Sequence, residues 1–111
     1  MRPCQVREMS DAEAAWVGAI IDAEGWVLIQ PIYKVNAVRI SVGNTEPEII
    51  SGLLRATGVG TVCHHKRSKP HHLPMFQWTA NAWNDVMAIA KRCAPYSMKA
   101  QKVLAQSRRI T

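Results

Sequence analysis

The sequence has no apolar run long enough to cross a membrane. Its longest uninterrupted run extends from Ala14 to Ile21, whereas about 20 residues are needed to span a bilayer. The first ten residues carry Arg2, Arg7 and Glu8 and lack the apolar segment of a secretory signal. Both absences predict a cytoplasmic, intracellular protein that has no membrane partner.

Cysteine is scarce, and its spacing does not suggest disulfide bonds. The three cysteines, Cys4, Cys63 and Cys93, are an odd number at wide intervals, which indicates reduced thiols. The chain has 111 residues, of which 48% are hydrophobic and 20% are charged. This length and composition predict one domain, residues 1–111, with a packed core rather than disorder.

Acidic residues are nearly absent from the second half of the chain. Residues 1–50 contain four Lys or Arg against seven Asp or Glu, a net charge of −3. Residues 51–111 contain ten Lys or Arg against one acid, Asp85, a net charge of +9. A segment this basic favours a polyanionic partner, because each phosphate contact gains from counterion release. The alternative is a basic protein with no such partner.

Capping and turn signals divide the chain into helices and strands. Ser10 and Glu13 are spaced as a capping box, and Gly25 suits a left-handed helix end. Thr45 and Glu48 predict a second capping box, for a helix that ends at Gly58. The predicted helices are 10–23, about 47–57, 81–93 and 97–107, and the predicted strands are 26–33, 35–43, 61–67 and 75–79. This order predicts an α+β fold with an antiparallel sheet.

The segment 17–25 combines two unusual features. Its helix contains small residues where large ones would bury more area, which favours close packing against another helix. It also ends in two acids, Asp22 and Glu24, where the helix dipole disfavours negative charge. A bound divalent cation would compensate for that charge. The alternative is an amphipathic core helix with an acidic, frayed end.

These residues, Val17 to Gly25, resemble the signature of the LAGLIDADG homing endonucleases. Residues 44–48 with 58–60 resemble the family's second helix and the turn after it, and residues 95–102 resemble its basic segment before the last helix. The resemblance covers nearly the whole chain. It implies the family fold, αββαββα(α) with a four-stranded antiparallel, saddle-shaped sheet.

The resemblance also implies catalytic residues. Glu24 would be the acid that binds Mg²⁺, with the backbone carbonyl of Ala23 as a further ligand. Lys99 would stabilise charge near the scissile phosphate, unless it is an ordinary surface lysine. Asn44 would organise water or, equally, cap the next helix. Glu48 stands where some members have an arginine, so one basic helper is in doubt.

A single motif per chain implies a homodimer on a pseudo-palindromic DNA site. The predicted dimer interface is Gly18, Ala19, Ile21 and Asp22, although Asp22 also suits the orientation of backbone amides at a helix end. The sheet would lie in the major groove, where base edges are distinguishable. Gln30, Arg39 and Gln77 have the best chemistry for reading bases. Alternation along the strands nominates the full set: Leu28, Gln30, Ile32, Lys34, Arg39, Ser41, Thr61, Cys63, His65, Arg67, Gln77 and Thr79. Other cations are expected to meet phosphates or solvent: Lys66, Lys69, Arg92, Arg108 and Arg109.

The predicted function is therefore site-specific, Mg²⁺-dependent cleavage of double-stranded DNA that leaves short 3′ extensions. The main alternative is a non-cleaving relative, either a regulator or an intron-splicing maturase with group I intron RNA as partner. Two weaker readings are a zinc site in Cys63, His64, His65, His71 and His72, and a structural module that only dimerises. The zinc spacing fits no standard finger.

Overall fold

The computed structural model describes residues 3–32, 35–65 and 74–110, and for residues 30–32, 35–36, 65 and 109–110 it describes the backbone alone. The elements are α1 (Asp11–Glu24), β1 (Gly25–Ile32), β2 (Val35–Asn44), α2 (Pro47–Thr57), β3 (Thr61–His65), β4 (Met75–Ala80), α3 (Trp83–Cys93), the short 3₁₀ helix η1 (Ala94–Tyr96) and α4 (Met98–Ile110). This order confirms the predicted α+β fold. None of the helices within the described ranges is long and apolar enough to cross a membrane.

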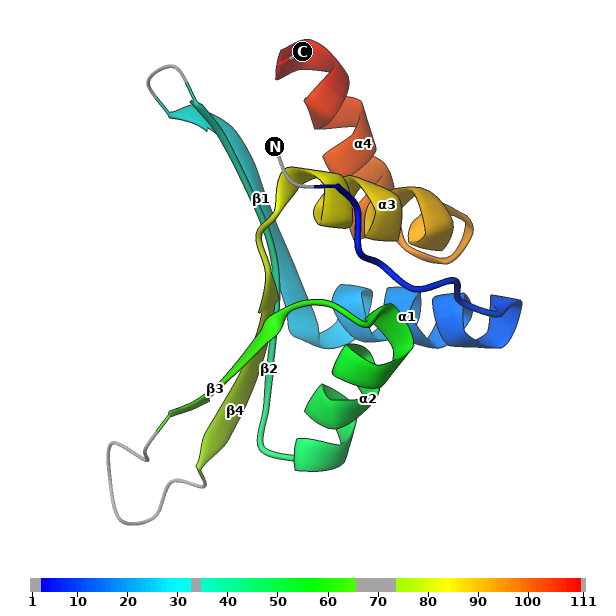
Figure 1. Cartoon of the computed structure of the whole chain (residues 1–111), viewed down its shortest axis with the longest axis vertical. Coiled ribbons are helices and arrows are strands. Elements are labelled where there is room, and N and C mark those ends of the chain that lie inside the picture. The colour runs from blue at the N-terminus through cyan, green and yellow to red at the C-terminus, as the bar shows by residue number, and fades with distance from the viewer. Residues whose placement is uncertain (1–2, 33–34, 66–73, 111) are drawn as a thin grey trace.

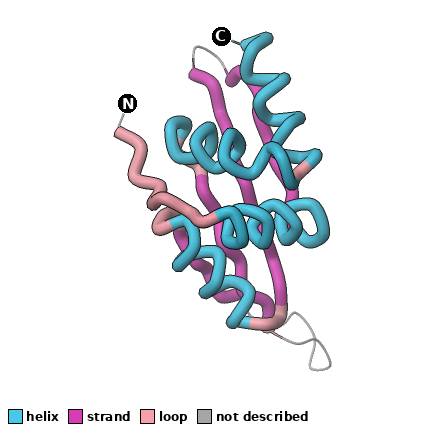
Figure 2. The backbone as a smooth tube through the Cα atoms, turned by 90° about the vertical axis from the view of Figure 1, so that its right-hand side faces the viewer, coloured by secondary structure: helices cyan, strands magenta, loops and turns pink. Residues whose placement is uncertain are grey.

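The four strands form one antiparallel sheet in the order β1-β2-β4-β3. Figures 1 and 2 show all the helices on one face of this sheet. Both ends of the sheet curve away from the helices, so the opposite face is concave (Figure 1). We call this concave, helix-free side the open face. By strand alternation, its described side chains are Trp26, Leu28, Ala37, Arg39, Ser41, Thr61, Cys63, Met75, Gln77 and Thr79.

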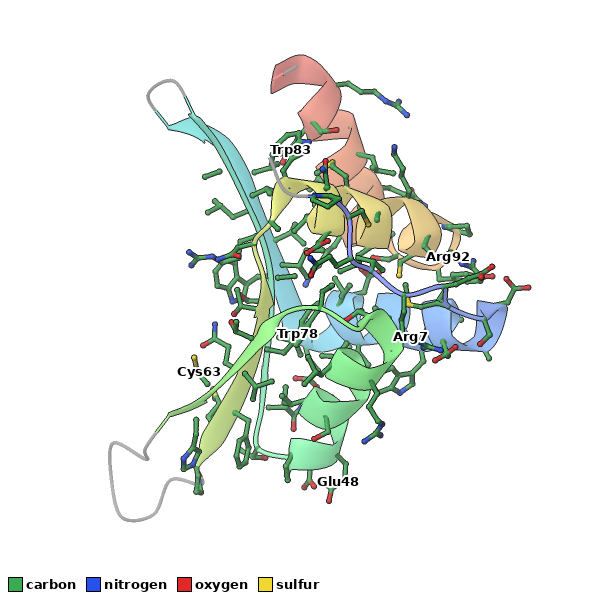
Figure 3. All side chains as sticks on the ribbon, in the orientation of Figure 1. Arg7, Glu48, Cys63, Trp78, Trp83 and Arg92 are labelled. Carbon is green, nitrogen blue, oxygen red and sulfur yellow. The ribbon has the colours of Figure 1, made fainter. Side chains whose placement is uncertain are left out.

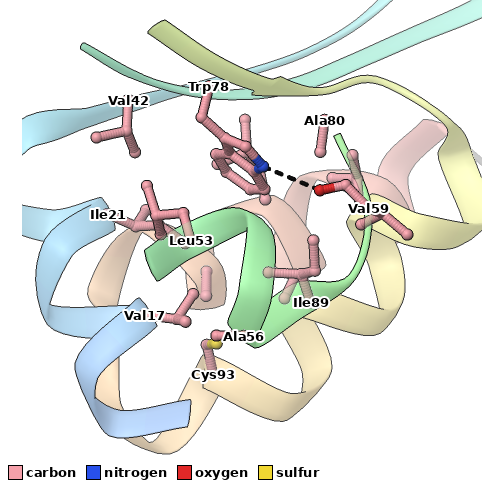
Figure 4. Close-up of a cluster of buried hydrophobic side chains, with 14 of the residues drawn as sticks. Val17, Ile21, Val42, Leu53, Ala56, Val59, Trp78, Ala80, Ile89 and Cys93 are labelled. Carbon is pink, nitrogen blue, oxygen red and sulfur yellow. Dashed lines mark hydrogen bonds between the residues drawn. The ribbon is translucent and has the colours of Figure 1, made fainter. Parts of the chain in front are cut away.

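The core lies between the sheet and the helices, around Trp78 of β4 (Figure 4). The Trp78 side chain is fully buried among residues such as Val42, Leu53 and Ile89. Its indole Nε1 donates a 2.9 Å hydrogen bond to the Val59 carbonyl, just after α2. The inward residues of the strands thus bury apolar area on the helical side alone, and the open face contributes little to the core.

The helix ends confirm some capping predictions and correct others. The Ser10–Glu13 capping box is present, and Gly58 ends α2 with φ +71° in the left-handed region. The Thr45–Glu48 box is wrong, because α2 is capped by Glu46 and no side chain bonds its first amides. Gly25 is extended, with φ −104°, and not left-handed. It is glycine because a Cβ there would lie 2.8 Å from the Ile21 carbonyl oxygen and 3.0 Å from that of Ser41.

Candidate functional site

Helix α1 leads directly into the sheet, because its last residue, Glu24, precedes the first residue of β1, Gly25. Glu24 is the last residue of α1, and both it and Ala23 are exposed. Gly25 is buried and pairs with Val42 of β2. Because Gly25 allows α1 to pack so closely against β2, Glu24 lies at the point in the chain where the helical layer joins the sheet.

Asp22 connects α1 to the first turn of α4. Its carboxylate accepts hydrogen bonds from Ser97 Oγ at 2.7 Å, the Met98 amide at 2.9 Å and the Lys99 amide at 3.1 Å. Ser97 is buried, and its Oγ also accepts from the Ala100 amide at 3.0 Å. Asp22 therefore orients backbone amides at a helix end, as one of its two predicted roles required. Both its oxygens accept hydrogen bonds within the chain, and its predicted place in a dimer interface stays a prediction.

Lys99 makes a second contact between α4 and the end of α1. Its Nζ donates a 2.5 Å hydrogen bond to the carbonyl oxygen of Gly25, the residue after Glu24. The ammonium group therefore lies beside the end of α1, and a catalytic role for Lys99 stays a prediction. We call these contacts of Asp22, Ser97, Lys99 and Gly25 the α1–α4 link.

Asn44 is not part of the α1–α4 link. Its Oδ1 accepts a 2.8 Å hydrogen bond from the Glu46 amide, in the turn that leads into α2. By strand alternation it shares the helix-covered face with Val42, and it makes no hydrogen bond to Glu24 or Lys99. The structure thus supports a turn role close to the predicted capping role, and a catalytic role for Asn44 stays a prediction.

The donors at the end of α1 suit a hard cation. Mg²⁺ prefers carboxylate and carbonyl oxygens together with water and phosphate. Glu24 offers an exposed carboxylate, and the Ala23 carbonyl belongs to the last helical turn, whose carbonyls lack partners within the helix. Among the described residues, no three His, Cys, Asp or Glu side chains gather in a metal-binding group. One chain therefore supplies part of an oxygen site, and other ligands would have to complete it.

By strand alternation, the open face carries all the predicted DNA-reading side chains that the structure describes. Arg39, Thr61 and Cys63 are exposed, and Leu28, Gln77 and Thr79 are half-buried. In Figure 3, Cys63 extends to this side of the sheet, whereas Trp78 points to the helices. The backbones of Gln30, Ile32 and His65 lie in strands, but their side chains are outside the described residues, as are Lys34 and Arg67 entirely.

Ser41 is a correction to that set. Its side chain points to the open face but has no exposed area, and its Oγ shares a 3.1 Å hydrogen bond with Thr79 Oγ1. It is therefore covered by its neighbours and cannot read a base edge from this position. Its partner on the neighbouring strand β1 is Trp26. This exposed residue was not predicted to read DNA, although strand alternation places it on the open face.

Two predicted interface residues are also corrections. Ile21 is 1% exposed and belongs to the core. Gly18 is buried under η1, where a Cβ would lie 3.1 Å from Tyr96 Cβ. The small residue thus admits η1 of the same chain and not a second copy. Ala19, the remaining nominee, is exposed.

Two expectations about other polar residues are resolved by the contacts. Cys63 and His64 point to opposite faces, and His64 stacks on Phe76 with ring centroids 4.9 Å apart, which does not support the zinc reading. His71 and His72 lie outside the described residues, with Lys66 and Lys69. Arg92 was expected to meet phosphate or solvent, but it donates to Met9 O at 3.0 Å and pairs with Asp11 at 2.7 Å.

The arrangement of four helices on one face of this sheet is the fold of the LAGLIDADG homing endonucleases. Homing endonuclease I-CvuI, solved with its target in the presence of Ca²⁺, aligns with TM-score 0.66 and 19% identity, covering 86% of this chain and 65% of that chain. I-CvuI with the I-CreI target and Mg²⁺, its DNA not cleaved, gives 0.63 and 20%, covering 85% and 64%. The archaeal intron-encoded I-Vdi141I in complex with DNA gives 0.56 and 17%, covering 78% and 56%.

The chain therefore spans less than two thirds of the length of these proteins. At such identities the likeness establishes the fold alone. Comparison with family models and with curated proteins gives no match.

The hydrogen bonds of Asp22 in the α1–α4 link should make the stability of the fold depend on pH. Burial raises the pKa of Asp22, but the hydrogen bonds from Ser97, Met98 and Lys99 outweigh it and hold that pKa below its usual value. A lowered pKa stabilises the fold above the unfolded-state pKa of about 4 and loses that contribution as the pH falls through the folded-state pKa. Asp22→Asn should cost about 1–2 kcal/mol at pH 7, as helix caps do, and less at acid pH.

Urea unfolding of both proteins at neutral and acid pH measures this difference. Asp11→Asn is the matched control, because it removes an exposed ion pair with Arg92 and should change stability less. An Asp22→Asn effect that stays constant down to acid pH would contradict the assignment.

Proposed function

We propose that this chain is a site-specific, metal-dependent DNA endonuclease that acts as a homodimer. One observation carries the proposal: the exposed Glu24 ends α1, and Lys99 is hydrogen-bonded to the carbonyl of the next residue, Gly25, where β1 enters a sheet whose concave face no helix covers. The DNA complexes of the fold neighbours support DNA as the ligand of that face.

The chemistry follows from the groups at the end of α1. Glu24 and the Ala23 carbonyl would hold Mg²⁺, which would supply an activated water molecule and charge stabilisation for hydrolysis of a phosphodiester. Lys99 would then exchange its bond to the Gly25 carbonyl for one to the phosphate, where its charge stabilises the transition state. Arg39 and the polar residues of the open face would set the register on the DNA.

A second copy is needed because each chain has one such glutamate, whereas a double-strand break requires cleavage of two strands. The exposed surface of α1 around Ala19 and Ala23 is where two copies can approach closely. Such a two-fold arrangement requires a pseudo-palindromic DNA site.

The test is to incubate the protein and Mg²⁺ with a library of randomised duplexes and to sequence the released ends. We expect one pseudo-palindromic family of sites with short 3′ extensions, cut by a complex containing two copies of the 12.4 kDa chain. Sedimentation of the protein on an uncut site measures that stoichiometry. Cleavage without sequence preference, or by a single copy, would contradict the proposal.

A second candidate function is a DNA- or RNA-binding protein that does not cut, such as a regulator or a maturase. Two contacts favour it: Lys99 Nζ is bound to the main chain, and Asn44 Oδ1 is used in a turn. Selection of a bound sequence from the same library, with no released ends at any Mg²⁺ concentration, would establish this function in place of cleavage.

A further inference from the structure

Trp26 is a large aromatic side chain exposed on the open face, two residues after Glu24. It is 46% exposed, whereas Val27 beside it packs against the core. An exposed indole has no stabilising function in the fold comparable to that of the buried Trp78, and tryptophan is enriched at contact surfaces. It directly follows Gly25, the first residue of β1, whose carbonyl accepts the hydrogen bond from Lys99, and so lies close in sequence to the proposed site at Glu24.

The strand register shows what surrounds this indole. Trp26 pairs with Ser41, Ser41 with Thr79, and Thr79 with Thr61, which forms one row across all four strands. Ser41 is completely covered and its hydroxyl is bonded to Thr79. At the β1 end of this row, a ligand on the open face therefore meets the indole and not the serine hydroxyl.

The next residue of β1 on the open face, Leu28, is also apolar. Leu28 follows Trp26 on the open face and pairs across to Arg39. Trp26 and Leu28 thus form an apolar strip along β1 next to the proposed cleavage point, with the guanidinium of Arg39 to one side. An indole has one N–H donor and no acceptor, so this strip can satisfy few of the hydrogen-bonding groups on a base edge.

One base-pair feature in the major groove is apolar, the 5-methyl group of thymine. Covering any base pair with this strip desolvates donors and acceptors, which costs free energy, but only a thymine methyl group offers an apolar contact in return, and G·C offers none. We propose that Trp26 is a specificity-determining residue that selects thymine, through its methyl group, at the base pairs nearest the cleavage point. This inference rests on the proposed function.

The experiment uses the site that the wild-type protein selects from the randomised library. Each thymine near the cut is replaced in turn by uracil, which removes the methyl group and keeps the base pair. We expect wild-type cleavage at subsaturating protein to fall about three- to tenfold at one inner position, the value of one buried methyl contact. Trp26→Ala should cut sites with thymine or uracil near the cut equally well. It should keep the wild-type sequence preference at base pairs farther from the cut.

Two further variants complete the test. Trp26→Phe keeps an apolar ring and should retain part of the thymine preference, with circular dichroism reporting that each variant is folded. Leu54→Ala removes an exposed apolar side chain from α2, away from the open face, and should leave the preference unchanged.

The outcomes separate the two proposals. If the wild type releases no ends, the proposed function fails and this inference fails with it. If the wild type cuts but uracil is tolerated, or if Trp26→Ala keeps the thymine preference, the inference alone is overturned. A preference for flexible steps such as TA that persists with uracil would assign Trp26 to DNA deformation instead.

Discussion

Glu24→Gln is expected to abolish DNA cleavage, by about a thousandfold or more, and to leave binding to the selected site within about threefold. Glutamine keeps the size of the side chain and removes the charge that a hard cation requires. Because Glu24 is exposed at the end of α1, the change should not affect folding. Gel-based cleavage of labelled duplex and a binding titration, both with Mg²⁺, measure the two effects.

The matched control is Glu48→Gln, the same substitution at another exposed glutamate. Glu48 lies in the first turn of α2, away from the open face (Figure 3), so cleavage should be unchanged. If Glu24→Gln still cuts, the site at the end of α1 is wrong, whatever the fold. If binding is lost together with cleavage, Glu24 acts in assembly or DNA contact rather than in chemistry.

The largest expected effect on stability is that of Gly60→Ala. Gly60 has φ +104° in the turn before β3, and a Cβ there would overlap Nε1 of Trp78 and lie 3.0 Å from the Thr79 carbonyl oxygen. Backbone strain and overpacking of the buried indole should together cost about 2–6 kcal/mol. That is a large part of the stability of a small domain, so thermal unfolding should occur at a much lower temperature.

Gly52→Ala provides the comparison for this prediction. Gly52 lies within α2, where alanine favours the helix by about 1 kcal/mol. The three atoms nearest to its added Cβ all belong to the ring of the exposed Trp16, with Cη2 at 2.7 Å, and that side chain can move. The net change should be small. Equal losses at both glycines would mean that the turn at Gly60 does not support Trp78 as described.

The sequence was sufficient for the fold because its local signals agree with one another. The capping box at Ser10, the glycine at Gly58 and the alternation of Val38, Ile40 and Val42 each determine a neighbouring element, and their order is that of the structure. Gly25 shows the limit of such reasoning. Its glycine was assigned to local backbone conformation, whereas it is required by the approach of Ile21 and Ser41, which no local pattern reveals.

The candidate site could be predicted only in part, for the same reason. The motif identified Glu24, but the partners of Asp22 and Lys99 lie more than 70 residues away in the chain. Strand parity assigned Ser41 to the correct face and could not show that its neighbours cover it. Gly18 was assigned to a contact between copies because a small residue in a helix does not indicate which surface approaches it.

The one-sided packing of the sheet separates stability from recognition. Nearly all the buried apolar residues are on the helical side, so most side chains on the concave side can be exchanged at little thermodynamic cost. If the open face binds DNA as we propose, substitutions at positions such as Arg39, Thr61 or Cys63 should change the sequence preference without first requiring extra stability. Ser41 should be the exception on that side, because its buried hydroxyl is hydrogen-bonded to Thr79 and a larger side chain there would lower the stability of the fold.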